Sequence, residues 1–305
     1  MSERRRSPDD LITIGEITDR ETWLAVRRAS LGASEVPAVI GIDPFKTALD
    51  VWAAKVGIKP DGRQSPQAAN GNRYEPAILA EYAEIVRCRL ARPGTLRIKA
   101  APWISATPDA VADDVRDVQV KAVGRFMSRK WDDGPPDYVI VQVQWELMVT
   151  GLAVADVVAK FSVTDPPAIF PVVRDDEMIA DLVEICGDWW ETHVVGGEMP
   201  EIVEGDSAMS VLAARFPRPT HGLLPMASEV EALARQYDKS RELQLQAEAE
   251  QKRIGAEICA RIGEAQGFEG PTARVTWKER AAHTRPACEV KAGRVLRVDL
   301  KGDRG

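Results

Sequence analysis

The sequence predicts an α/β core followed by a helical extension. The apolar spacing changes from the helical period of 3.6 to the strand period of 2 near residue 96, and it becomes helical again before residue 150. After Pro200 the composition turns polar and rich in Ala, Glu, Gln and Arg. We therefore expect four parts, namely a flexible tail (1–19), an α/β core (20–200), a linker (201–226) and a helical extension ending in a small β-hairpin (227–305).

The composition is that of an ordinary folded protein. The chain has 305 residues, a formal net charge of −7, 45% hydrophobic residues and 29% charged residues. This apolar fraction excludes a wholly disordered chain, and no stretch approaches the roughly 18 apolar residues of a membrane span. The charged N-terminus lacks the apolar segment of a secretory signal. We therefore expect a cytoplasmic protein without a membrane partner.

The first part of the core is predicted to be helical. Helices are expected over 21–29 and 47–56, and Ser34 is placed to cap a short helix that follows it. A stronger amphipathic pattern predicts a helix over 74–86, with Pro76 in its first turn, where proline is tolerated. The segment before that helix is rich in Gly, Gln and Pro, so we expect it to be a loop.

The rest of the chain predicts alternating strands and helices. The core elements expected are strands over 96–106 and 115–123 around a turn at Asp113-Asp114, an apolar helix over 138–150 ended by Gly151, a strand over 153–163 and a helix over 175–195. The extension is expected to form one long helix over 227–266 and then strands over 273–279 and 290–300.

The most informative segment is Thr107-Pro108-Asp109, followed ten positions on by Gln119-Val120-Lys121. Residues two apart in a strand share a face, so Gln119 and Lys121 point the same way, as does Asp117. If the preceding strand pairs with this one, Asp109 lies near both. An acid and a carbonyl oxygen can hold a divalent metal that activates water, and a lysine can stabilise charge on a phosphate. The arrangement suits phosphodiester hydrolysis, although an ordinary polar surface hairpin has the same spacing.

Metal ligands other than oxygen are scarce in the sequence. The cysteines contain no C-x-x-C pair, which argues against a disulfide framework and a zinc–thiolate site. The three histidines are far apart, at His193, His221 and His283. A catalytic metal would therefore be held by carboxylates and carbonyl oxygens, which points to Mg²⁺ or Mn²⁺.

Other polar residues are candidates for the same site. Glu75 is a carboxylate expected at a helix start, where the helix dipole alone would explain it. Arg27 and Ser34 offer a cation and a hydroxyl near a helix N-terminus, which makes an anion site unless Ser34 is a plain cap. Gln142 and Gln144 are unusual in an apolar helix, although one of them could be exposed.

Taken in order, these residues resemble the YqaJ-like viral recombinase and phage lambda exonuclease family, within the P-D…(D/E)-x-K nuclease superfamily. The resemblance covers about residues 20–200. It runs through Trp23, Arg27, Gly32-Ala33-Ser34-Glu35, Ile40-Gly41, Leu49-x-x-Trp52, Gly71-x-x-x-Glu75-Pro76, Thr107-Pro108-Asp109, Gln119-x-Lys121, Trp131, Gln142-x-Gln144 and Thr150-Gly151. It implies a restriction-endonuclease-like core in which helices flank a central mixed β-sheet.

The resemblance also implies an activity. It implies a Mg²⁺-dependent 5′-to-3′ exonuclease, with Mn²⁺ as a possible substitute, that degrades one strand of linear double-stranded DNA. The remaining 3′ tail would serve a phage single-strand annealing protein in the cytoplasm of a bacterial host. Related enzymes form trimeric rings around DNA, and such a homo-oligomer would reconcile the net charge of −7 with DNA binding.

Site roles follow by the same resemblance. The metal ligands would be Asp109, Gln119, Glu75 and the backbone carbonyl of Val120. Lys121 would be the catalytic lysine, and Gln142 would be the glutamine near the active site. Arg27 and Ser34 would bind the 5′ phosphate of the strand being cut.

Gln119 departs from the family pattern, which usually has Glu at this position. A carboxamide is neutral and binds Mg²⁺ more weakly than a carboxylate does. Gln119 could be a natural variant that still binds metal with help from Asp117, an engineered change that traps substrate, or the mark of a chain that binds DNA ends without cutting them. A restriction-type endonuclease, a non-catalytic recombination scaffold and a structural phage protein remain as alternatives.

Overall fold

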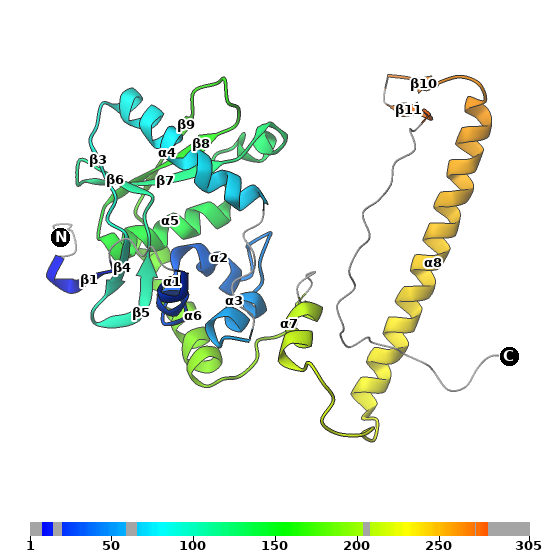
Figure 1. Ribbon diagram of the computed structural model, residues 1–305, viewed down its shortest axis with the longest axis horizontal. Coiled ribbons are helices and arrows are strands. Elements are labelled where there is room, and N and C mark those ends of the chain that lie inside the picture. The colour runs from blue at the N-terminus through cyan, green and yellow to red at the C-terminus, as the bar shows by residue number, and fades with distance from the viewer. Residues whose placement is uncertain (1–7, 15–19, 59–65, 204–207, 272, 280–305) are drawn as a thin grey trace. The chain divides into compact units, whose positions relative to one another are not determined.

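The structure, a computed structural model, describes residues 8–14, 20–58, 66–203, 208–271 and 273–279 (Figure 1). The chain divides into two compact units, Met1–Arg215 and Phe216–Gly305. The first unit holds helices α1 (Arg20–Arg28), α2 (Val36–Val39), α3 (Ala48–Lys55), α4 (Pro66–Val86), α5 (Asp137–Thr150), α6 (Asp176–Trp189) and α7 (Ala208–Arg215). Shorter helical turns are η1 (Pro8–Asp10), η2 (Ala33–Glu35), η3 (Arg125–Trp131) and the π-helical η4 (Trp190–Val195).

The described residues of this unit form two sheets. One of their strands, Leu11–Ile14, lies in the segment 1–19 that was expected to be a flexible tail, so that expectation is wrong there. The five-stranded sheet has the order β3 (Leu90–Ala91), β6 (Ala110–Ala112), β7 (Arg116–Ala122), β8 (Val154–Lys160) and β9 (Ala168–Val173). The four-stranded sheet has the order β1 (Leu11–Ile14), β4 (Thr95–Ile98), β5 (Ala101–Ala106) and β2 (Leu31–Gly32). Strands β7 and β8 are parallel and so are β2 and β5, whereas the other pairs are antiparallel. The predicted mixed α/β core is therefore confirmed.

The strand predicted over 96–106 is wrong in detail. It is two strands, β4 and β5, which fold back on each other in the four-stranded sheet, and the exposed Lys99 and Ala100 separate them. The strand that pairs with β7 is β6, around the predicted turn at Asp113-Asp114, where both residues have positive φ. Strand β9 was not predicted because of Pro171, but β9 is an edge strand, where a residue without an N–H is tolerated.

Helix α4 is longer than predicted. It begins at Pro66, inside the segment expected to be a loop, because Gln and Ala are good helix formers that outweigh the nearby Gly. Pro76 therefore lies inside the helix and not in its first turn. Glu75, expected at a helix start, lies in the helix interior as well. By contrast, the end of α5 is as predicted, since Gly151 takes the left-handed conformation there, with φ 70°.

The five-stranded sheet is covered by helices on both faces, with α4 and α5 packed against β7 from opposite sides (Figure 1). Val118 and Val120 of β7 pack with Ile78, Leu79 and Tyr82 of α4. The alternate residues of β7 therefore face α5. This alternation places the polar residues of the predicted site between β7 and α5.

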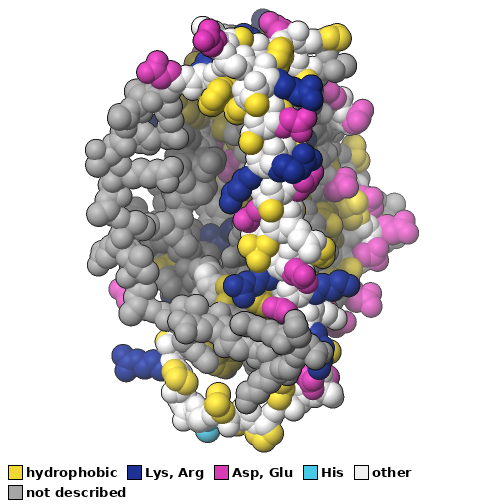
Figure 2. Space-filling model, turned by 90° about the vertical axis from the view of Figure 1, so that its right-hand side faces the viewer, with side chains coloured by type: hydrophobic (Ala, Val, Ile, Leu, Met, Phe, Trp, Pro, Cys, Tyr) yellow, Lys and Arg dark blue, Asp and Glu magenta, His cyan; other side chains and the backbone are white. Residues whose placement is uncertain are grey.

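The second unit is dominated by α8 (Ser228–Ile262), which confirms the predicted long helix. Figure 2 shows acidic and basic side chains interspersed along it, and pairs such as Arg261 with Glu257 (2.9 Å) join successive turns. The hairpin consists of β10 (Gly267–Glu269) and β11 (Arg274–Thr276), so β11 pairs with an unpredicted strand. The strand expected over 290–300 lies outside the described residues. No helix in the described ranges is long and apolar enough to span a membrane.

Candidate active site

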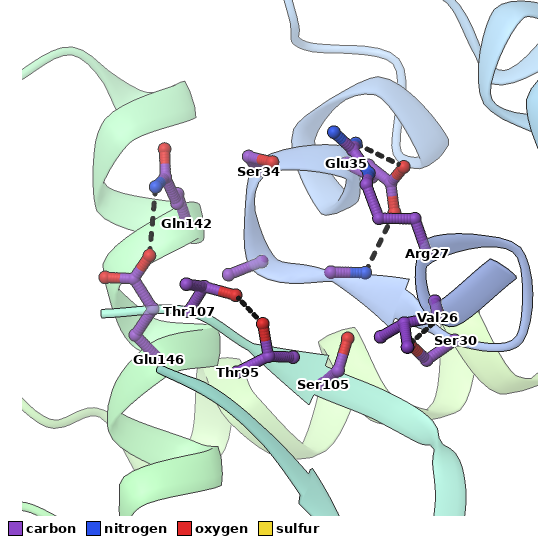
Figure 3. Close-up of a pocket in the computed structure, with 12 residues that line it drawn as sticks. Val26, Arg27, Ser30, Ser34, Glu35, Thr95, Ser105, Thr107, Gln142 and Glu146 are labelled. Carbon is purple, nitrogen blue, oxygen red and sulfur yellow. Dashed lines mark hydrogen bonds and ion pairs between the residues drawn. The ribbon is translucent and has the colours of Figure 1, made fainter. Parts of the chain in front are cut away.

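A cavity of about 220 Å³ brings several of the predicted residues together (Figure 3). Arg27 lies on one side of it and Gln142 and Glu146 lie on the other, with Ser34 between them. The remaining lining residues are Val26, Ser30, Gly32, Ala33, Glu35, Thr95, Ser105 and Thr107. The cavity therefore joins the predicted anion site, from the α1–η2 region, to residues of α5.

Asp109, Gln119 and Lys121 meet beside α5. Asp109 immediately precedes β6, and its Oδ2 accepts hydrogen bonds from Gln119 Nε2 (2.5 Å) and from the backbone N–H of Val120 (2.8 Å). The ammonium of Lys121 donates to Gln142 Oε1 (2.7 Å). Sequence reasoning expected this proximity through the strand over 96–106, but the β6–β7 pair produces it.

A continuous hydrogen-bonded chain runs from Lys121 to Asp109. Gln142 accepts from Lys121 and donates through Nε2 to Gln119 Oε1 (2.8 Å), and Gln119 donates in turn to Asp109. A lysine ammonium can only donate and an ionised carboxylate can only accept, so the two ends fix the orientation of both amides. The carbonyl oxygen of Gln119 therefore points toward Gln142 and its nitrogen points toward Asp109.

Burial and neighbouring negative charges raise the pKa values of the acids around these hydrogen-bonded residues. Burial raises the pKa of Asp109 to about 6, and the negative charge of Glu75 adds to that rise, against the Val120 N–H and Lys121. Glu75 is therefore electrostatically close to Asp109, and its own Oε1 accepts from Arg92 (3.1 Å). Burial lowers the pKa of the Lys121 ammonium, opposed chiefly by the charge of Asp109.

Two further carboxyl groups lie next to Gln119 and Gln142, namely Asp117 on β7 and Glu146 on α5. Their exposed fractions are 0% and 1%, and burial raises the pKa of each. Glu146 Oε1 accepts from Gln142 Nε2 (2.9 Å). Within the described part of the chain, no group donates a hydrogen bond to Glu146 Oε2. The rise in the pKa of Asp117 by burial is opposed by hydrogen bonds with Glu146 and the Val118 N–H. Sequence reasoning missed Glu146, although an acid four residues after Gln142 in an apolar helix was a usable signal.

These donors fit a hard divalent cation. Among the residues that the structure describes, no three His, Cys, Asp or Glu side chains are grouped so that they could hold a metal ion. Mg²⁺, however, is usually bound through one or two carboxylates, with water and substrate phosphate completing its shell. Asp109, Glu75 and the carbonyl of Val120 are oxygen donors of that kind. In the described part of the site, Asp109, Asp117 and Glu146 outnumber the one ammonium beside them, Lys121, so the cluster carries an excess of acidic groups.

The opposite side of the cavity is a completed ion network centred on Glu35. Its carboxylate accepts from Arg27 Nη2 (2.8 Å), Lys55 Nζ (2.5 Å) and the Gly32 N–H (2.9 Å). Burial alone would raise the pKa of Glu35, but the charges of Lys55 and Arg27 and these hydrogen bonds lower it to about 2. The network holds the Arg27 side chain at the cavity wall.

Ser34 and Gln144 have different roles from those weighed in the sequence. Ser34 is not a helix cap, because η2 begins at Ala33 and its first turn is closed by Glu35 and Gly32. Its side chain instead lines the cavity beside Arg27. Gln144 is buried, donates to the Val173 carbonyl (2.8 Å) and accepts from the Asp175 N–H (2.9 Å), so it joins β9 to α6.

The sequence of the chain is similar to those of known proteins. Residues 22–153 match the family model of the YqaJ-like viral recombinase domain. The chain is 27% identical over 204 residues to the "Uncharacterized protein YqaJ" of Bacillus subtilis (strain 168), covering 65% of this chain and 63% of that protein. It is 26% identical over 149 residues to the "Uncharacterized protein R354" of Acanthamoeba polyphaga mimivirus, covering 44% and 27% of the two.

A solved structure shows the same fold. The alkaline exonuclease LHK-Exo from Laribacter hongkongensis superimposes with a TM-score of 0.52 at 17% identity, covering 58% of this chain and 93% of that one. At this identity the likeness concerns the fold. The resemblance stated from the sequence, and the expected core of mixed sheets flanked by helices, are therefore confirmed.

Proposed function

We propose that this chain, which carries a YqaJ-like viral recombinase domain, is a Mg²⁺-dependent exonuclease that degrades linear double-stranded DNA from 5′ to 3′. The observation that carries the proposal is the shared cavity. Hydrogen bonds link Asp109 and Lys121 to Gln142 on one of its sides, and Arg27 and Ser34 line the other. Asp109 and Lys121 do not line the cavity themselves, but they are hydrogen-bonded to its wall through Gln142. A hydrolytic group beside one wall and an anion site on the opposite wall suit cleavage near a terminal phosphate.

Each residue on the acidic side of the site would have a separate role in cleavage. Asp109, Glu75 and the Val120 carbonyl would hold Mg²⁺, or Mn²⁺ in its place, and the ion would supply an activated water and neutralise phosphate charge. Lys121 would donate from its ammonium to an oxygen of the scissile phosphate, positioned by Gln142. Gln119, predicted as a metal ligand, would need its amide to turn over before its oxygen could face Asp109.

On the other side of the cavity, Arg27 and Ser34 would bind the terminal 5′ phosphate. A guanidinium recognises phosphate oxygens through paired N–H groups. The Arg27 side chain is 27% exposed and lines the cavity, so a phosphate bound there would lie next to it. A fixed cation at this position would favour strands that end in a 5′ phosphate.

The proposal extends to assembly and partners on the strength of the family resemblance. A homotrimeric ring around the duplex would keep the enzyme on its substrate despite the net charge of −7. The 3′ tail that remains would be passed to a phage single-strand annealing protein in the cytoplasm of a bacterial host. A second candidate function is DNA-end binding without cleavage, which the neutral side chain of Gln119 favours.

The test is digestion of linear, 5′-phosphorylated duplex with Mg²⁺, with closed circular DNA as the substrate control. We expect the chain to shorten 5′-ended strands of linear DNA only, and Lys121→Ala to lower the rate by at least about 100-fold. Lys99→Ala, at an exposed lysine, is the matched control and should cut normally. Cleavage of circular DNA would instead indicate an endonuclease. Cleavage by Gln119→Glu alone would indicate an end-binding protein.

A further inference from the structure

We propose that Glu146 supplies to the cation site the carboxylate that position 119 lacks. The inference rests on the proposed function, because it concerns the same divalent cation. It assigns a ligand role to a residue of α5 in place of one on β7. Four features of the structure support it.

The first feature is the place of Glu146. Gln142 Nε2 donates both to Gln119 Oε1 (2.8 Å) and to Glu146 Oε1 (2.9 Å). The carboxylate of Glu146 and the side-chain oxygen of position 119 therefore flank the same amide group. The carboxylate of Glu146, from α5, thus lies close to the place that the carboxylate of a glutamate at position 119 would occupy.

The second feature is access to substrate. Glu146 is 1% exposed, yet it lines the cavity together with Arg27 and Ser34 (Figure 3). A cation bound there would lie on the wall that faces the proposed phosphate site. Asp117, by contrast, is 0% exposed and does not line the cavity, so it lies behind Glu146.

The third feature is an incomplete set of partners. Oε2 of Glu146 receives no hydrogen bond from any described residue, and the buried carboxyl of Asp117 lies against Glu146. A buried carboxylate without donors is costly, so such groups normally face a cation or share a proton. Asp117 and Asp109 add negative charge around Glu146. A divalent cation would satisfy the unpartnered oxygen and relieve this repulsion.

The fourth feature is the orientation of Gln119. The hydrogen-bonded chain from Lys121 to Asp109 turns the carbonyl oxygen of Gln119 away from Asp109. Presenting that oxygen to a cation beside Asp109 would require both amides to turn over and Lys121 to leave Gln142. Glu146 Oε2 accepts no hydrogen bond from the described residues, so it can bind a cation without either amide turning over.

The experiment measures Mn²⁺ binding to the DNA-free protein by electron paramagnetic resonance, which does not depend on cleavage. We expect Glu146→Gln to weaken Mn²⁺ binding at least tenfold, as should Asp109→Asn. The exchange Gln119→Glu with Glu146→Gln should restore the affinity to within about threefold, since it returns the carboxylate from β7. Glu84→Gln, which removes an exposed acid from α4, is the matched control and should bind normally. Thermal unfolding in EDTA checks that each variant folds.

The outcomes separate this inference from the proposed function. If Glu146→Gln binds Mn²⁺ as the unaltered chain does while Asp109→Asn does not, Glu146 is not a ligand, and the exonuclease proposal stands. If the exchange variant binds no better than Glu146→Gln alone, the two positions are not equivalent and the inference is wrong. If the unaltered chain neither binds Mn²⁺ nor digests DNA, the proposed function fails with it.

Discussion

Two buried glutamates, Glu35 and Glu146, line the same cavity, but their pKa values are shifted in opposite directions. Their exposed fractions are 3% and 1%. Glu35 receives a guanidinium, an ammonium and a backbone N–H, and its pKa is lowered to about 2. Glu146 receives one amide N–H, faces other acids, and has a pKa well above its usual value.

Burial is nearly the same for both groups, so their donors and the charges around them account for the difference. On the Glu35 side, residues of the protein alone supply the donors that the buried carboxylate needs, which is typical of a structural ion network. The acidic side is not complete, and groups with pKa values raised by burial and like charge gather at functional sites. The cavity therefore has the guanidinium of Arg27, held by Glu35, on one side and a cluster with more acids than bases on the other.

The largest expected effect is the loss of the Glu35 network. Glu35→Gln leaves the ammonium of Lys55, which is 1% exposed, without its carboxylate. Removing one partner of a buried ion pair costs about 3–5 kcal/mol. Urea unfolding should show a loss of that size, and a loss below about 1 kcal/mol would mean that Lys55 is satisfied by the carbonyls of Arg27 and Ser30 alone.

The same glutamate gives a pH dependence of known sign. Its pKa lies near 2 in the folded chain and near 4.5 when unfolded, because Lys55 and Arg27 hold the ionised form. The stabilisation is therefore complete above about pH 4.5 and is lost as the pH falls toward 2. A shift of this size corresponds to about 3 kcal/mol. Urea unfolding from pH 5 to 2.5 should show this slope in the unaltered chain, and Glu35→Gln should lack it.

Removing Arg27 tests whether this side of the cavity binds phosphate. Arg27→Ala should reduce the preference for 5′-phosphate over 5′-hydroxyl ends by about 10–100-fold, since it removes a charged hydrogen-bond donor. Glu35 keeps Lys55 as its partner, so the fold should persist. The measurement is the ratio of digestion rates on the two ends. Arg28→Ala, at the exposed neighbouring arginine, is the control. An unchanged ratio would place the phosphate elsewhere.

The acidic side should respond to neutralisation in the opposite way from Glu35. In EDTA, Glu146→Gln should leave the free energy of unfolding unchanged or raise it by about 1 kcal/mol, because it removes one carboxyl group from a cluster of buried acids. Urea unfolding at pH 8 measures the difference. A destabilisation equal to that of Glu35→Gln would show that Glu146 is already paired, and the contrast between the two sides would disappear.

The two sides also differ in how much of them the sequence could predict. The spacing of Asp109, Gln119 and Lys121 is local, because the turn between β6 and β7 sets it, so their proximity could be expected. Glu35 and Lys55 are 20 positions apart and on separate elements, so nothing in the spacing indicated their pairing. The division of segment 96–106 into two strands could not be predicted either, because the alternation of apolar and polar residues does not show which strands pair.

The smallest expected effect belongs to Ser34, which lies between the two sides of the cavity. Its hydroxyl takes part in none of the hydrogen bonds that hold η2, so Ser34→Ala should leave stability unchanged. A single neutral hydrogen bond contributes about 1 kcal/mol, so the preference for 5′-phosphate ends should fall only about two- to fivefold. Ser128→Ala, outside the cavity, should change nothing. A loss as large as that of Arg27→Ala would mean that the hydroxyl is a main contact, and that the phosphate binds nearer the acidic side than Arg27 suggests.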